Sequence, residues 1–221
     1  MTNLLATSES FESLRINLVE LGAKRLIHRA HLKALKDCDI VDGTGIVHRW
    51  IQENYADSML IGLRRSLDNR KDSFSLIRLL RHVQSDRGFH TIDNFITLCA
   101  RQHDYDEWYA RALYGRYSGD GGTLDRKRID DDIKTVVAGS VTVLGYVNDF
   151  VAHQAANANS TTPSTPLNWA DLDRLFDEIT GLFNKYYGLV KPGVHVDFDP
   201  VLPAGFQRAF DRMVTQVDTT G

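Results

Sequence analysis

Apolar residues recur at spacings of three, four and five over most of the chain, which is typical of one buried face of an α-helix. The first such pattern predicts a helix from Ser8 or Ser10, either of which suits an N-cap, to about Asp37. A second helix is predicted from Ile46 to Leu67, after a turn at 41–45. Further helices are predicted over residues 73–83, 91–101, 104–117, 124–156 (capped by Thr123), 168–186 and 206–217. Asn168 with Asp171 starts the helix over 168–186. The apolar face of that helix consists of Leu172, Leu175, Phe176, Ile179, Leu182, Phe183 and Tyr186.

The positions of proline support long helices in the first part of the chain. All five prolines follow residue 162, so no ring interrupts a helix before that point. Residues 157–168 are rich in Ser, Thr and Pro and predict a polar linker, and 194–199 alternate as an extended segment does. The predicted fold class is therefore all-α, a bundle of long antiparallel helices over 1–190 that contains the linker. A C-terminal extension with a short helix is predicted over 191–221.

Composition narrows the function classes. The 221 residues are 43% apolar and 25% charged with a net charge of −3, which suits a globular protein. That charge gives no overall cationic field for nucleic acid, so any such contact needs a local basic face. The weakly polar run 136–147 is too short to span a membrane, and the first residues do not resemble a secretory signal. We expect a cytoplasmic protein with reduced Cys38 and Cys99, no cofactor and no metal.

Two groups of residues that contain histidine have a spacing typical of metal or phosphate sites. His28 and His31 have ligand-like spacing, but cations surround them, so a solvated basic face is favoured and a contact with phosphates is a secondary possibility. The cations are Lys24, Arg25, Arg29, Lys33 and Lys36. His195, Asp197 and Asp199 would share one face of an extended segment, which suits either a divalent cation or a half-buried strand.

Two further groups carry candidate chemistry. Arg64 and Asp68 are four apart and can pair on a helix surface, which leaves Arg65 to point elsewhere or to form a basic patch beside a groove. Asp149 and His153 are also four apart, late in the predicted helix 124–156. A carboxylate at that spacing can fix the tautomer of the imidazole and raise its basicity. The same pair is also consistent with an ordinary polar contact.

The segment Asn148-Asp149-Phe150-Val151-Ala152-His153 resembles the Arg-polar-x3-His motif of the HEPN superfamily, whose members are α-helical bundles. Asn148 stands in the Arg position, Asp149 in the polar position and His153 in the His position. The segments 58–80 and 186–189 (Tyr-Tyr-Gly-Leu) and the Ala-His pair resemble the abortive-infection AbiU-type branch. In 58–80 the matching pattern is Leu-x-Arg-x-x-Asp followed by Ser-x-x-Arg-Leu-Leu.

The resemblance implies a dimeric, metal-independent endoribonuclease. In that chemistry a His moves protons while the 2′-OH of RNA attacks the adjacent phosphate, and an Arg stabilises the developing charge. Asn148 has no charge, so either another cation, with Arg64 and Arg65 the nearest candidates, supplies it, or the domain no longer cleaves. The alternatives are a non-catalytic module that binds nucleotide, RNA or an antitoxin-like protein partner, and a purely structural helical dimer. Gly139, Ser140 and Gly145 suit close approach of helices in a homodimer.

Overall fold

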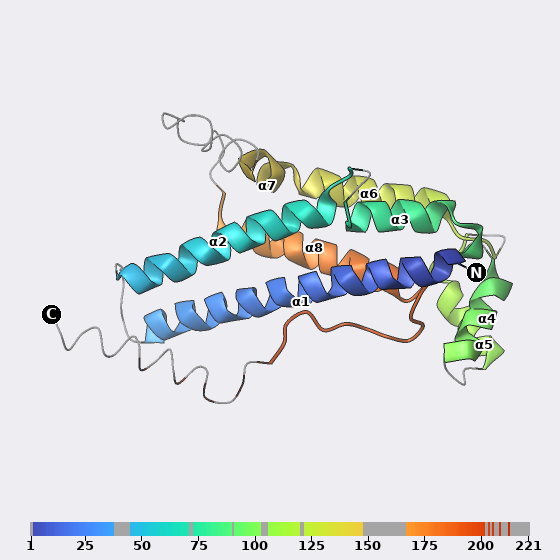
Figure 1. Ribbon diagram of the computed structural model, residues 1–221, viewed down its shortest axis with the longest axis horizontal. Coiled ribbons are helices and arrows are strands. Elements are labelled where there is room, and N and C mark those ends of the chain that lie inside the picture. Colours follow the sequence, from blue (N-terminus) through green and yellow to red (C-terminus); the bar gives the residue numbers. More distant parts are fainter. Residues whose placement is uncertain are drawn as a thin grey trace. The chain divides into compact units, whose positions relative to one another are not determined.

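The computed structural model describes residues 2–37, 45–70, 73–89, 91–102, 106–119, 122–147 and 167–201, together with 203, 205, 208 and 212; for 2–6 only the backbone is described. The helices are α1 (Thr2–Asp37), α2 (Ile46–Leu67), α3 (Leu76–Ser85), the 3-10 helix η1 (Arg87–Phe89), α4 (Ile92–Gln102), α5 (Glu107–Tyr114), α6 (Arg126–Gly139), α7 (Val141–Tyr146) and α8 (Trp169–Tyr187) (Figure 1). The only β-pairing in this part of the chain is two isolated bridges, Thr91 with Thr123 and Ser118 with Leu124. The predicted all-α class is confirmed.

The chain divides into two compact units, and the boundaries fall within α1 and α2. Unit 1 contains residues 1–16 and 63–196, and unit 2 contains 17–62 and 197–221. The division into 1–190 and 191–221 that the sequence suggests stays a prediction.

In unit 1, α3, α6 and α8 pack against one another, and α4 packs against α5 (Figure 1). The side-chain amide of Gln84, at the end of α3, donates to the carbonyl of Arg126, at the start of α6 (3.0 Å), so these two helices run antiparallel. The first turns of α1 join this core through Phe11, whose ring meets the Phe183 ring edge-on at 5.7 Å. The apolar face predicted for the last long helix is confirmed except at Leu182, which is half-buried; α8 buries Leu172, Leu175, Phe176, Ile179, Phe183 and Tyr186.

In unit 2, the second part of α1 packs against the first part of α2. The rings of His28 and Tyr55 stack at 4.0 Å and 11°, and those of His31 and His48 stack at 5.0 Å and 24°. The helices are so close at Gly62 that a Cβ atom there would lie 2.6 Å from Leu21 Cδ1. Glycine therefore permits the contact between α1 and α2.

Side-chain caps explain where three of the helices begin. Ser75 caps α3 and accepts from Arg78 N (3.3 Å), and Asn168 forms a reciprocal capping box with Asp171, as predicted. Asp125, rather than Thr123, caps α6. The long helix predicted from Leu124 is interrupted at Ser140, whose hydroxyl donates to Val137 O (2.7 Å) and competes with the helical backbone pattern. The predicted continuation from 148 to 156 lies outside the described residues.

The C-terminal tail is anchored without forming a strand in its described part. The side chain of Asn184 on α8 both donates to and accepts from the backbone of Val196, at 2.9 Å each. The predicted helix over 206–217 lies mostly outside the described residues. No helix within the described ranges is long and apolar enough to cross a membrane.

Candidate functional site

The motif residues Asn148, Asp149 and His153 lie outside the described residues, so their geometry stays a prediction. The structure does describe the helices that lead to them. Val143 and Val147 are buried at the end of this lead-in, and α7 packs against both α6 and α8. The chain thus enters the motif segment from the packed core of unit 1.

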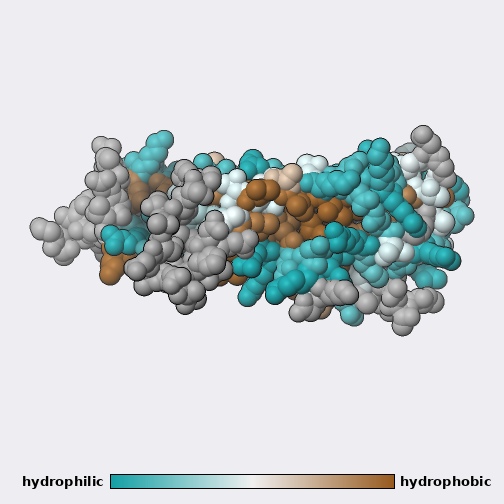
Figure 2. Space-filling view, turned by 90° about the horizontal axis from the view of Figure 1, so that it is seen from above, coloured by the Kyte–Doolittle hydropathy of each residue, from teal (hydrophilic) through white to brown (hydrophobic). Residues whose placement is uncertain are grey.

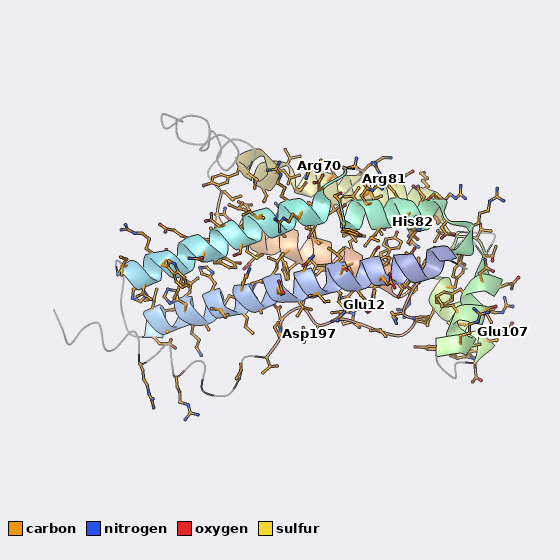
Figure 3. All side chains as sticks on the ribbon, viewed as in Figure 1. Glu12, Arg70, Arg81, His82, Glu107 and Asp197 are labelled. Atoms are coloured by element: carbon orange, nitrogen blue, oxygen red, sulfur yellow. The ribbon has the colours of Figure 1, made fainter. Side chains whose placement is uncertain are left out.

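The turn between α2 and α3 belongs to the same end of unit 1. Because α3 and α6 run antiparallel, the start of α3 lies toward the end of α6, from which the chain continues to the motif. Figure 3 shows Arg70 at this turn, with Arg81 and His82 further along α3. The segment 58–80, which carries part of the family-like pattern, forms this turn and the helix ends on either side of it.

Hydrogen bonds within the turn explain two polar positions of that pattern. Asp68 accepts from the backbone N–H of Arg70 (3.0 Å) and forms an ion pair with its guanidinium (2.7 Å). The hydroxyl of Ser75, which is fully buried, donates to the carbonyl of Asp68, and the hydroxyl of Ser73 donates to the same carbonyl at 2.9 Å. Asp68 and Ser75 therefore shape the backbone between α2 and α3.

The two arginines predicted near the site are both exposed at the end of α2. Asp68 is paired with Arg70 rather than with Arg64, which corrects the predicted pair, since a turn residue two positions away reaches the carboxylate more directly. The N–H of Arg70 is the main reason that the pKa of Asp68 lies below its usual value, and Arg64 adds a weaker electrostatic contribution. No ion pair is found for Arg64 or Arg65 within the described part of the chain.

The small residues predicted to favour helix contact have different surroundings. A Cβ atom at Gly139 would lie 2.5 Å from Glu178 Oε2 on α8, and Ser140 is fully buried, so both serve packing within this chain. Among the described residues, no atom lies within 4 Å of a Cβ atom placed at Gly145. Val137 and Val141, four apart on α6 and α7, expose 42% and 66% of their surface, and Figure 2 shows hydrophobic side chains exposed over this part of the structure.

A polar cluster between α6 and α8 was missed by sequence reasoning. Asp132 Oδ2 accepts from Lys185 Nζ (2.5 Å) and from the hydroxyl of Tyr186 (2.6 Å). Burial and the hydrogen bond to this carboxylate raise the pKa of Tyr186 far above its usual value. The run Asp130-Asp131-Asp132 gave no signal of which carboxylate faces the core, and the cluster holds α6 in place ahead of the motif.

In unit 2 the predicted basic face is only partly correct. Lys24, Arg29, Lys33 and Lys36 are exposed, whereas Arg25, His28 and His31 are buried, with 3%, 3% and 1% of their surface accessible. The histidine spacing of three matches the side of α1 that faces α2, and aromatic stacking accommodates the rings there. Burial and the neighbouring His48 lower the pKa of His31, which favours the neutral ring.

No group of three or more His, Cys, Asp or Glu side chains within the described ranges lies close enough together to bind a metal ion. His195, Asp197 and Asp199 are all exposed, and Asp197 accepts from the backbone N–H of Asp199 (3.0 Å). Cys99 is buried, and burial raises the pKa of its thiol.

Comparison with known proteins adds one finding. The family model HEPN_AbiU2, described as AbiU2, matches residues 43–209, which include the α2–α3 turn, α6 to α8 and the segment 148–153. Searches of curated proteins and of solved structures found no match.

Proposed function

Because the chain belongs to the AbiU2 family of HEPN proteins, the abortive-infection branch, we propose that it acts in phage defence or a toxin–antitoxin system as a metal-independent endoribonuclease. His153 is the proton-transferring group, Asp149 orients its imidazole, and RNA is the substrate. The family match over the segment that contains both residues is the observation that carries this proposal.

The chemistry needs a proton acceptor for the 2′-OH and a positive charge for the phosphate. A helix that continues beyond Val147 brings Asp149 and His153 onto one face, because residues four apart are neighbours on a helix. Asn148 donates a hydrogen bond but cannot neutralise a phosphate. The exposed Arg64 and Arg65 belong to the same unit and supply that charge in our proposal.

We further propose a homodimer in which two motif segments share a cleft. An isologous contact uses the same surface on both chains, and the exposed stripe of Val137 and Val141 leads along the helices toward the motif. In this proposal a second helix packs beside Gly145, where no atom of the described residues lies within 4 Å of an added Cβ. Light scattering at micromolar protein tests this directly, and a 25.0 kDa monomer contradicts the shared cleft.

A cleavage assay on purified total RNA tests the catalytic proposal. His153→Ala should abolish cleavage and leave the melting temperature nearly unchanged, and EDTA should have no effect. His195→Ala, at an exposed position in the tail, is the matched control and should cleave like the wild type. Activity that survives His153→Ala, or that disappears with EDTA, refutes the mechanism.

One observation favours a second function, a non-catalytic module that binds nucleotide, RNA or an antitoxin-like protein. Asn148 replaces the cation of the motif, and loss of one preorganised stabilising group typically costs about 10²–10³ in rate. In that case wild-type protein retains RNA without cleaving it, or purifies with a protein partner of fixed stoichiometry. The cleavage and RNA-retention measurements together separate the two functions.

A further inference from the structure

Five exposed cations from three elements meet where α3 ends and α6 begins: Arg87, Arg116, Arg126, Lys127 and Arg128, which we call the basic junction. Arg87 begins η1, Arg116 follows α5, and the other three form the first turn of α6. Figure 2 shows hydrophilic side chains gathered over these ends of α3 and α6.

Hydrogen bonds between the elements hold the basic junction together. Arg128 Nη1 donates to the carbonyl of Arg116 (2.9 Å), and Asp125 N donates to the carbonyl of Tyr117 (2.9 Å). The buried hydroxyl of Tyr114, at the end of α5, donates to the carbonyl of Phe89 in η1 (2.9 Å). These hydrogen bonds therefore join the backbone segments that carry the five cations.

The acidic residues of these turns are engaged with backbone groups. Asp125 caps α6 by accepting from Arg128 N (3.0 Å), and Asp86 accepts from Gly88 N (2.8 Å) with only 13% of its side chain exposed. No ion pair is found for Arg87, Arg116 or Lys127 among the residues that the structure describes. The basic junction thus has more positive than negative charge, although the whole chain is acidic.

An exposed aromatic pair lies on the neighbouring helix. Trp108 and Tyr109, at the start of α5, stack at 6.0 Å and expose 71% and 37% of their surface. Trp108 lies in the first turn of α5, Arg116 follows the end of that helix by two residues, and both side chains are exposed. Exposed cations and exposed aromatic rings carried by neighbouring segments suit single-stranded nucleic acid, whose phosphates pair with the cations and whose bases stack on the rings.

We propose that the basic junction and Trp108 form a docking surface for single-stranded RNA, separate from the motif segment. In the sequence, α6 and α7 separate the basic junction from the motif segment, a helical length of about 30 Å. The choice of RNA rests on the proposed function, whereas the position of the surface rests on the geometry alone. The surface holds the backbone of RNA while the motif segment acts on another part of the same strand.

The test is fluorescence anisotropy with a labelled, mixed-sequence RNA whose 2′ oxygens are methylated, so that binding is measured without cleavage. Arg116→Ala with Lys127→Ala should weaken binding at least about tenfold. The logarithm of the binding constant should also fall less steeply with the logarithm of the salt concentration, with a slope shallower by roughly 1.4 between about 50 and 200 mM salt. Lys134→Ala with Arg174→Ala is the matched control, since it removes equal charge from residues already paired with Asp131 and Glu178, and should bind like wild type.

Trp108→Ala should weaken binding by roughly tenfold, while Trp50→Ala, an equally exposed tryptophan on α2, should not. Equal effects of test and control variants, no binding by wild type, or equal competition by polyglutamate or anionic vesicles would overturn the proposal. The probe cannot be cleaved, so loss of catalysis by His153→Ala leaves this result unchanged. The failure of either proposal is therefore visible without the other.

Discussion

Tyr187, the last residue of α8, donates a hydrogen bond from its hydroxyl to the carboxylate of Glu12 on α1, and so links the beginning of unit 1 to its final helix. Arg15 binds the other oxygen of Glu12 at 2.6 Å. Burial opposes ionisation of Glu12, but the hydrogen bonds from Tyr187 and Arg15, together with the charges of Arg15 and Lys191, outweigh it and lower the pKa of the carboxyl. The charged form of Glu12 therefore stabilises the fold.

We expect Tyr187→Phe to lower the free energy of unfolding by about 1–2 kcal/mol at neutral pH, because a charged group loses one donor near the surface. Since the folded pKa of Glu12 is depressed, this contribution is present above its unfolded value of 4.5 and is lost as the pH falls through the folded pKa. Urea unfolding at several pH values should show the two proteins converging in acid. Glu9→Gln, at an exposed position on α1, is the control and should change little.

Two glycines within helices should respond to alanine with opposite signs. At Gly62 the new Cβ would meet Leu21, which is 5% exposed and has little room to move, so we expect Gly62→Ala to destabilise by about 1–3 kcal/mol. At Gly181 on α8 the new Cβ would meet no neighbouring atom of the described residues within 4 Å, so alanine should stabilise by about 0.5–1 kcal/mol through helix propensity. Thermal unfolding measures both, and Gly62→Ala combined with Leu21→Ala should recover part of the loss. A stabilising Gly62→Ala would show that α1 and α2 are not closely packed there.

Local chemistry in the sequence predicted the ends of some helices but not of others. The helix α1 begins at Thr2 rather than at the predicted caps Ser8 or Ser10, and Asp125 rather than Thr123 caps α6. The second helix was predicted with the bounds that α2 has, and Asn168 was identified as a cap because its reciprocal bonds with Asp171 are local. Other features depend on tertiary contacts that spacing does not encode. Asp68 pairs with a turn residue instead of a helical neighbour, and His28 and His31 are buried because the aromatic rings of α2 stack on them. The motif geometry, at residues 148–153, stays a prediction from the resemblance and the family match.

Ser75 combines two roles in the α2–α3 turn, as the N-cap of α3 and as a donor to Asp68 O. We expect Ser75→Ala to cost about 1–2 kcal/mol, because a buried cap and a turn bond are lost together. Ser85→Ala is a suitable control, since its exposed hydroxyl at the other end of α3 donates to the carbonyl of His82 in the same helix, and its loss should cost less than about 0.5 kcal/mol. Urea unfolding compares the two, and equal effects would show that the turn contributes no stability beyond α3 itself.

His31 gives unit 2 a predicted dependence on pH. Its folded pKa lies below the usual 6.5 because of burial and the adjacent His48, so the unfolded chain binds the proton more readily. Stability should be greatest above about pH 6.5 and fall as the pH decreases from there toward the folded pKa. The dependence of the melting temperature on pH, measured between about pH 5 and 8, should become weaker in His31→Gln. It should stay unchanged in His195→Gln, because the ring of His195 is exposed. An unchanged profile in His31→Gln would exclude this residue as the source.

The replacement of the motif arginine by Asn148 leads to the most direct prediction about activity. We expect weak RNA cleavage by wild type and a gain with Asn148→Arg, because a guanidinium can neutralise and bind the phosphate that an amide can only hydrogen-bond. If Arg64 or Arg65 already supplies the charge, its change to Ala should instead lower cleavage by about 10²–10³. Arg174→Ala, which removes an exposed cation paired with Glu178 on α8, controls for net charge in single-turnover assays. Strong wild-type cleavage that is indifferent to Arg64→Ala, Arg65→Ala and Asn148→Arg would show that the stabilising charge comes from elsewhere, and would refute these roles for all three residues.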